Sequence, residues 1–104
     1  MDINIIRKLC EKRKIEWTLH AAKRLLQRGI SSLDVETSIN NGVIIEAYPD
    51  DSPYPSCLVM GITTEKRVLD VVCAIDGDKL WIITAYEPNS NEWEADFRTR
   101  KVGT

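Results

Sequence analysis

The stretch that decides the fold is residues 17–30, WTLHAAKRLLQRGI, which contains the only histidine of this 104-residue chain. His20, Arg24 and Arg28 follow one another at four-residue steps, and on an α-helix such steps place side chains in one stripe. The apolar side chains lie at helical spacing on the other side: Leu19, Ala22, Leu25 and Leu26. The pattern predicts a helix over residues 19–29 that packs its apolar side on a core.

The basic side of this helix is either a phosphate-binding surface or an ordinary solvated face. The net charge of −2 conceals a segregation, because residues 1–29 carry +5, residues 30–97 carry −10 and residues 98–104 carry +3. Such a dipolar chain can attract a polyanion to one surface or bind a partner of complementary charge.

Helices are also expected on both sides of this stretch, at residues 2–14 and 32–41, and residues 15–17 are expected to form a short extended link. After residue 42 the apolar period changes from 3.6 to 2, which predicts strands. Four strands are expected, at residues 43–48, 56–63, 67–76 and 80–87. The polar tail, 88–104, is expected to dock a final helical turn on the sheet through Trp93 and Phe97.

These elements predict one α+β domain over residues 1–104. Two or three N-terminal helices would pack on one face of a four-stranded, mainly antiparallel sheet, because the connections between the strands are short. The later strands are more apolar than a sheet covered on one side requires. We therefore expect a second chain, either another copy or a partner, to cover part of the other face.

Composition excludes several classes of protein. The longest apolar runs have the length of a strand, so no membrane-spanning helix is expected, and the N-terminus lacks the pattern of a secretory signal. Cys10, Cys57 and Cys73 form no CxxC motif and accompany a single histidine, so we expect buried free thiols in a reducing, cytoplasmic compartment. No metal site and no cofactor are expected.

Several sequence motifs resemble those of one family, domain of unknown function 4258. The first is His20-Ala21-x-x-Arg24-x-x-x-Arg28-Gly29-Ile30, and the second is Gly42-x-Ile44-Ile45-Glu46-x-Tyr48-Pro49-Asp50-Asp51. The others are Pro53-x-Pro55-Ser56-Cys57-Leu58, Thr84-x-Tyr86-Glu87-Pro88 and Trp93-Glu94-x-Asp96-Phe97-x-x-Arg100. This family is grouped by fold with the RelE/ParE-like toxins and stands near the BrnT-like toxins.

The resemblance implies a RelE/ParE-like fold and the toxin half of a toxin–antitoxin pair, with a small antitoxin, sometimes a zinc-finger protein, as its partner. RelE-like toxins cut RNA without metal, by letting a ribose 2′-hydroxyl attack the adjacent phosphate. The chain departs from the family at one place: where many relatives carry His in the word Leu-His-Val-Val, it has Asp70.

The cleavage chemistry needs a base, a cation and an acid. His20 and Arg24 are the first candidates, and Tyr86 can donate a proton or stack on a base. Asp70 either changes the chemistry or abolishes it. The candidate substrate-binding residues are basic: Lys23, Arg28, Arg98 and Arg100.

Each candidate also has a structural interpretation. The His20 imidazole can donate an orienting hydrogen bond to the backbone, and Tyr86 can belong to the core. Arg24 and Arg28 can pair with carboxylates such as Glu46, Glu87 and Asp70. The carboxyl group of Asp70 must be paired or lie at an exposed groove.

Three functions therefore remain open. The first is a metal-independent endoribonuclease restrained by an antitoxin. The second is a non-catalytic protein-binding module that keeps the fold without the reaction. The third is a self-associating protein whose apolar sheet face is its own interface. RNA is a partner only under the first, and no membrane is expected under any of them.

Overall fold

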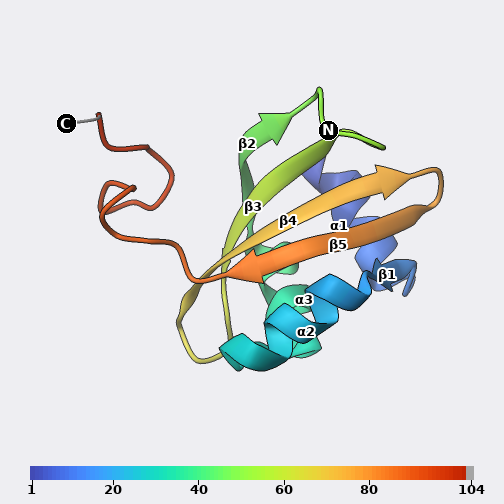
Figure 1. Cartoon of the computed structure of the whole chain (residues 1–104), viewed down its shortest axis with the longest axis horizontal. Helices are drawn as coiled ribbons and strands as arrows, with labels where there is room; N and C mark the ends of the chain where they lie inside the picture. The colour runs from blue at the N-terminus through green and yellow to red at the C-terminus, as the bar shows by residue number, and fades with distance from the viewer. Residues whose placement is uncertain (103–104) are drawn as a thin grey trace.

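Three helices and one five-stranded mixed sheet make up the computed structural model, which describes residues 1–102 (Figure 1). The helices are α1 (Ile3–Glu11), α2 (Leu19–Arg28) and α3 (Ser32–Asn41). The strands are β1 (Ile15–Trp17), β2 (Val43–Tyr48), β3 (Ser56–Ile62), β4 (Val68–Asp76) and β5 (Lys79–Tyr86). The helices cover one face of the sheet, and the C-terminal segment leaves β5 on the other side (Figure 1).

The sheet has five strands rather than the expected four, and it is mixed: three strand pairs are antiparallel, and one, between β1 and β5, is parallel. Residues 15–17 are not a link: they form β1, which pairs in parallel with β5 and gives the order β1-β5-β4-β3-β2. Ile15 and Trp17 pack against the core from this position. A run of three residues is too short to show a period of two, so only the tertiary structure reveals this strand.

The apolar face expected for α2 is right only at Leu25, and the helix ends at Arg28, one residue before the expected limit. Ala21 and Leu25 are buried, whereas Leu19 is 74% exposed and Leu26 is 83% exposed. A ten-residue helix laid on β5 touches it through one narrow stripe, and the small Ala21 allows close approach. The Thr18 hydroxyl caps the helix by accepting a hydrogen bond from the Ala21 amide, as expected.

Helix α3 lies directly against the middle of the sheet. Ser31 and Asp34 form the expected capping box at its start. Gly61 in β3 permits the contact, since a Cβ atom at this position would lie 2.0 Å from the carbonyl oxygen of Ser38. Helix α1 ends at Glu11, earlier than the expected residue 14, because Arg13 adopts a left-handed conformation with φ of 59°.

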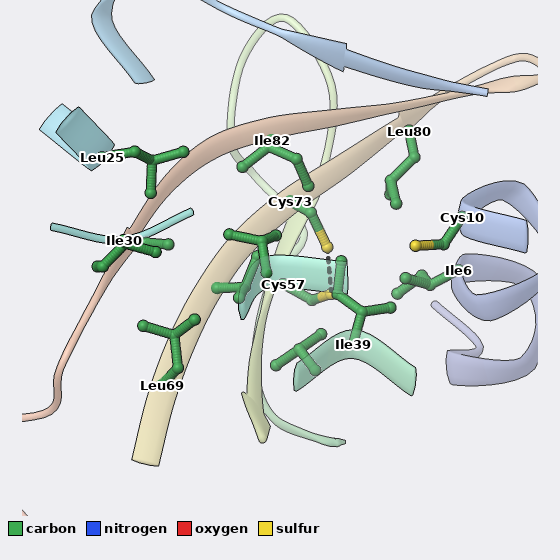
Figure 2. Packing of buried hydrophobic residues seen from close by; sticks show 14 residues of the cluster. Ile6, Cys10, Leu25, Ile30, Ile39, Cys57, Leu69, Cys73, Leu80 and Ile82 are labelled. Carbon is green, nitrogen blue, oxygen red and sulfur yellow. Dashed lines mark hydrogen bonds between the residues drawn. The ribbon is translucent and has the colours of Figure 1, made fainter. Parts of the chain in front are cut away.

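The core fills the space between the helices and the inner face of the sheet. Figure 2 shows side chains from α1, α2, α3 and the central strands meeting there. The sulfur atoms of Cys57 and Cys73 point toward each other at 3.9 Å, and both thiols, like that of Cys10, are buried and free. The expectation of buried, unbridged cysteines is confirmed.

The C-terminal tail forms a folded turn rather than the expected helical turn. An isolated antiparallel bridge joins Trp93 to Arg100, and the Asp96 carboxylate accepts hydrogen bonds from the amides of Arg98 and Thr99. Trp93 is the docking residue, as expected, and only 3% of it is exposed. Within residues 1–102 no helix has the length and apolarity needed to cross a membrane.

Candidate functional site

Asp70 lies on the face of the sheet that the helices leave uncovered, here called the outer face. Its neighbours along β4, Leu69 and Val71, belong to the core on the inner face, so alternation directs Asp70 outward. It stands opposite Met60 of β3 and opposite Tyr86 of β5. These three side chains therefore form one row across the outer face.

The carboxyl group of Asp70 is buried without a partner. The residue is 0% exposed, and neither carboxylate oxygen accepts a hydrogen bond from the described residues. Burial raises its pKa from 3.8 to about 7, while the charge of Arg100 opposes this rise and the charge of Glu46 adds to it. A carboxyl group with a pKa near neutrality can both accept and release a proton at physiological pH.

The C-terminal tail is bound to this part of the outer face. Glu46 of β2 stands opposite Leu58, and Leu58 stands opposite Val72, two residues from Asp70 on the same face. The guanidinium of Arg100 donates to the Glu46 carboxylate through Nε at 2.8 Å and through Nη2 at 3.1 Å. The tail is thereby bound beside the row that contains Asp70.

Two aromatic residues complete the cluster around Glu46. The Tyr48 hydroxyl donates to Glu46 at 2.6 Å, and the Arg100 guanidinium stacks on Trp93, 4.3 Å from the ring centroid. The hydrogen bond from Arg100 lowers the pKa of Glu46, whereas burial raises the pKa of Tyr48. The cluster thus combines a fixed carboxylate, a fixed guanidinium and a protonated phenol.

Tyr86 connects this cluster to the end of α2. The Arg28 guanidinium lies 5.9 Å from the Tyr86 ring centroid, and it donates to the Ala85 carbonyl at 2.8 Å and to the Thr84 hydroxyl at 3.2 Å. A pocket of about 330 Å³ lies between Arg28, Tyr86 and the adjacent Glu87. Burial, followed by the charge of Asp70, raises the pKa of Tyr86, which therefore stays a proton donor near neutral pH.

The four candidate catalytic residues do not come together. Asp70 and Tyr86 are direct cross-strand neighbours on the outer face, whereas His20 and Arg24 are exposed on α2, which packs against the inner face. Ala21 and Leu25 occupy the space where α2 meets the sheet. The expected groove between this helix and the sheet, with His20 and Arg24 in reach of Asp70, is not formed.

The candidate substrate-binding residues are also divided. Lys23 is exposed on α2, and Arg28 spans from α2 to β5. Arg98 lines a groove of about 380 Å³ together with Lys66 and Met60, the β3 partner of Asp70. Arg100 is already bound to Glu46, so it is a structural latch in this state.

The pairings considered for the arginines differ from those observed. Arg28 binds a backbone carbonyl and a hydroxyl rather than a carboxylate. Arg67 binds Glu87 at 2.8 Å and approaches Asp34 at 3.6 Å, and Arg100 binds Glu46.

Sequence analysis missed Glu46, Tyr48 and Lys66 as members of the site. Glu46 and Tyr48 lie in one of the words shared with the family, and that was the available signal. Lys66 follows a strand in a polar turn and gave no signal. In residues 1–102 no three His, Cys, Asp or Glu side chains gather as a metal site would require.

One comparison with known proteins gives a match. The family model described as "Domain of unknown function (DUF4258)" matches residues 17–87, from the last residue of β1 to the residue after β5. No curated protein and no solved structure matches. The match includes Asp70, Tyr86 and Glu46, while α1 and the tail lie outside it.

Proposed function

The chain belongs to the DUF4258 family, and we propose that it is the toxin of a toxin–antitoxin pair, a metal-independent endoribonuclease whose reacting groups surround Asp70. The buried Asp70 carboxyl, with its pKa of about 7 and Tyr86 directly opposite, supports this proposal most directly. The RelE/ParE-like fold that the sequence resembles is part of the proposal. The three helices on a mixed sheet are compatible with it.

The proposed reaction uses the two residues as base and acid. Ionised Asp70 accepts the proton of a ribose 2′-hydroxyl, and the 2′ oxygen forms a bond to the adjacent phosphorus. The bond from phosphorus to the next nucleotide's 5′ oxygen breaks, and Tyr86 gives its proton to that oxygen. The products are a 2′,3′-cyclic phosphate and a free 5′-hydroxyl, and solvent returns the proton from Asp70 to Tyr86.

Cations on both sides of this pair are suited to holding the phosphates. Arg28 lines the pocket beside Tyr86, and Arg98 and Lys66 line the groove beside Met60. Guanidinium groups bind phosphate in bidentate fashion and stabilise charge that develops in the transition state. His20, Lys23 and Arg24 then serve as an additional electrostatic contact on the helix side rather than as reacting groups.

The tail must leave Asp70 before RNA can react. Neither carboxylate oxygen is accessible while Arg100 is bound to Glu46 and Trp93 is buried. The structure is therefore a closed form under this proposal. We place the active protein in the cytoplasm, with a small antitoxin, of zinc-finger type in some relatives, as its partner.

A second candidate function is a non-catalytic protein-binding module. The observations that favour it are the complete burial of Asp70 and the exposure of Leu19 and Leu26 on α2. Large exposed apolar side chains on a small protein are typical of surfaces that bind other proteins.

RNA cleavage by purified protein tests the proposal. Labelled RNA is incubated with wild type, D70N, Y86F and H20A in EDTA, with and without ribosomes, and circular dichroism confirms that each variant folds. We expect the cleavage rate of D70N to be lower than that of wild type by a factor of about 10²–10⁴, as for removal of a general base. H20A is the matched control and stays within about threefold of wild type, since an exposed electrostatic contact contributes little.

Growth arrest on expression gives the parallel measurement in cells. If H20A abolishes cleavage while D70N does not, the reacting groups lie on α2 and the outer-face site is wrong. If wild type cleaves no RNA, free or on ribosomes, and does not arrest growth, the binding module stands.

A further inference from the structure

A second groove opens on the outer face, away from Asp70. Its volume is about 290 Å³, and Ala74, Trp81 and Ile83 form its floor between β4 and β5. Tyr54, from the loop between β2 and β3, forms part of its wall. Ala74 lies four residues along β4 from Asp70, a separation of about 13 Å in an extended strand. The groove is therefore separate from the proposed reaction site.

The groove is apolar and remains open to solvent. Ile83 is 37% exposed and Tyr54 is 41% exposed, in contrast to the fully buried Asp70. The tail is bound at the Glu46 end of the outer face, and none of its residues from 88 to 102 lines the groove. This is the part of the sheet that we expected, from the sequence, to be covered by a second chain.

The charge around the groove has one sign. Asp51 and Asp76 line it, and no lysine or arginine does. Lys79, the strand partner of Asp76, lies 3.3 Å from Glu16, and Lys14 lies 3.9 Å from Asp78. The groove consequently repels phosphate and attracts cations.

We propose that this groove binds a basic segment of a partner protein, an extended stretch in which apolar side chains alternate with Lys or Arg. Aromatic faces such as those of Trp81 and Tyr54 attract a guanidinium or ammonium group, and Asp76 lies at the same groove to pair with it. The aliphatic stem of the basic side chain and its apolar neighbours fit the apolar floor. The proposal is independent of RNA cleavage, and its test involves no RNA.

Fluorescein-labelled peptides of eight residues test it by fluorescence anisotropy. The first alternates leucine with arginine, the second alternates serine with arginine, and the third alternates leucine with glutamate. We expect the leucine–arginine peptide to bind at least about tenfold more tightly than the serine–arginine peptide, and the glutamate peptide not to bind.

Three variants locate the binding. D76N and Y54A each weaken binding of the leucine–arginine peptide by about five- to tenfold. Asn keeps the turn preference of Asp76, and Tyr54 lies on an exposed loop, so both variants should fold. E65Q, which removes an exposed charge from another connection, is the matched control and leaves the affinity unchanged.

Three results overturn the proposal. The first is absence of binding by the leucine–arginine peptide. The second is equal affinity for the serine–arginine peptide, which shows attraction by net charge alone. The third is an equal loss in E65Q and D76N, which places the peptide outside the groove. A shift of the Trp81 indole NH resonance on titration, assigned with W81F, confirms the location independently of affinity.

Discussion

The side chains of Arg100 and Glu46 form a two-point ion pair between residues 54 positions apart in the chain, with N–O distances of 2.8 and 3.1 Å. This ion pair ties the tail to the sheet. Because Arg100 also stacks on Trp93, one side chain both pairs with the sheet and holds the buried indole of the tail.

Substitution of Arg100 is expected to release the tail. R100A should shift Trp93 fluorescence to longer wavelength and speed hydrogen exchange in residues 89–101, with global folding retained. The side chain of Arg100 is 49% exposed, so solvent screens the pair, and a double-mutant cycle with E46Q should give a coupling of about 0.5–1 kcal/mol.

The coupling should also depend on pH. Since the pair lowers the pKa of Glu46 from 4.5, the stabilisation is present above that value and is lost as the pH falls through the lowered pKa. A coupling that is unchanged at pH 2 would show that the interaction between Arg100 and Glu46 does not depend on the charge of the Glu46 carboxylate.

Substitution of Asp70 should change how stability depends on pH. The native pKa of about 7 lies above the ordinary 3.8, so between these values the unfolded chain is ionised while the native chain stays protonated. The free energy of unfolding of the wild type therefore falls by up to about 4 kcal/mol as the pH rises through this window, and it levels off above the window.

The variant D70N lacks this titration and should gain stability relative to wild type as the pH rises from 4 to 8. Urea unfolding at a series of pH values measures the difference. Parallel curves for the two proteins would mean that Asp70 titrates normally.

Addition of a methyl group at Gly61 should disrupt the packing of α3 on β3. The new Cβ atom would meet the backbone of Ser38 at 2.0 Å, and backbone atoms cannot give way as a flexible side chain can. We expect G61A to lose about 3 kcal/mol or more in the free energy of unfolding, measured with urea.

G29A is the matched comparison. No atom lies within 4 Å of a Cβ there, so the cost comes only from the φ of 66° and should be about 1 kcal/mol. An equal loss in both variants would indicate that backbone freedom, not close approach, explains the effect at Gly61.

The purified chain should contain no stoichiometric zinc. It has one histidine, and its three cysteines are buried and free, so the usual ligands of a structural zinc site are not available together. Elemental analysis after dialysis checks this, and one zinc per chain would contradict it. Zinc found only in a complex would belong to the partner.

Local patterns predicted most of the fold. Caps at Thr18 and Ser31 set the starts of two helices, and alternation placed the four long strands to within one or two residues. The short β1 could not be found in this way, because its pairing with β5 depends on contacts distant in sequence. The rotation of α2 depends equally on tertiary packing, since both of its faces contain apolar residues.

The site was predicted only in part, for a similar reason. Asp70 and Tyr86 stood out by their residue types, and antiparallel pairing brought them together. His20 and Arg24 formed an equally suggestive stripe, but the helix that carries them turns it away from the sheet. The pairing of Arg100 with Glu46 follows from the path of the tail, which no local period encodes.

The hydrogen bond from Arg28 to the Ala85 carbonyl affects how variants at this position should be interpreted. β1 pairs only with residues 80–82 of β5. Beyond residue 82 this side of β5 is therefore an open strand edge, except where Arg28 binds the Ala85 carbonyl. Exposed strand edges of this kind pair with strands from other molecules. Removal of Arg28 would therefore promote aggregation in the cell. If R28A no longer arrests growth, lost solubility explains the result before lost RNA binding does.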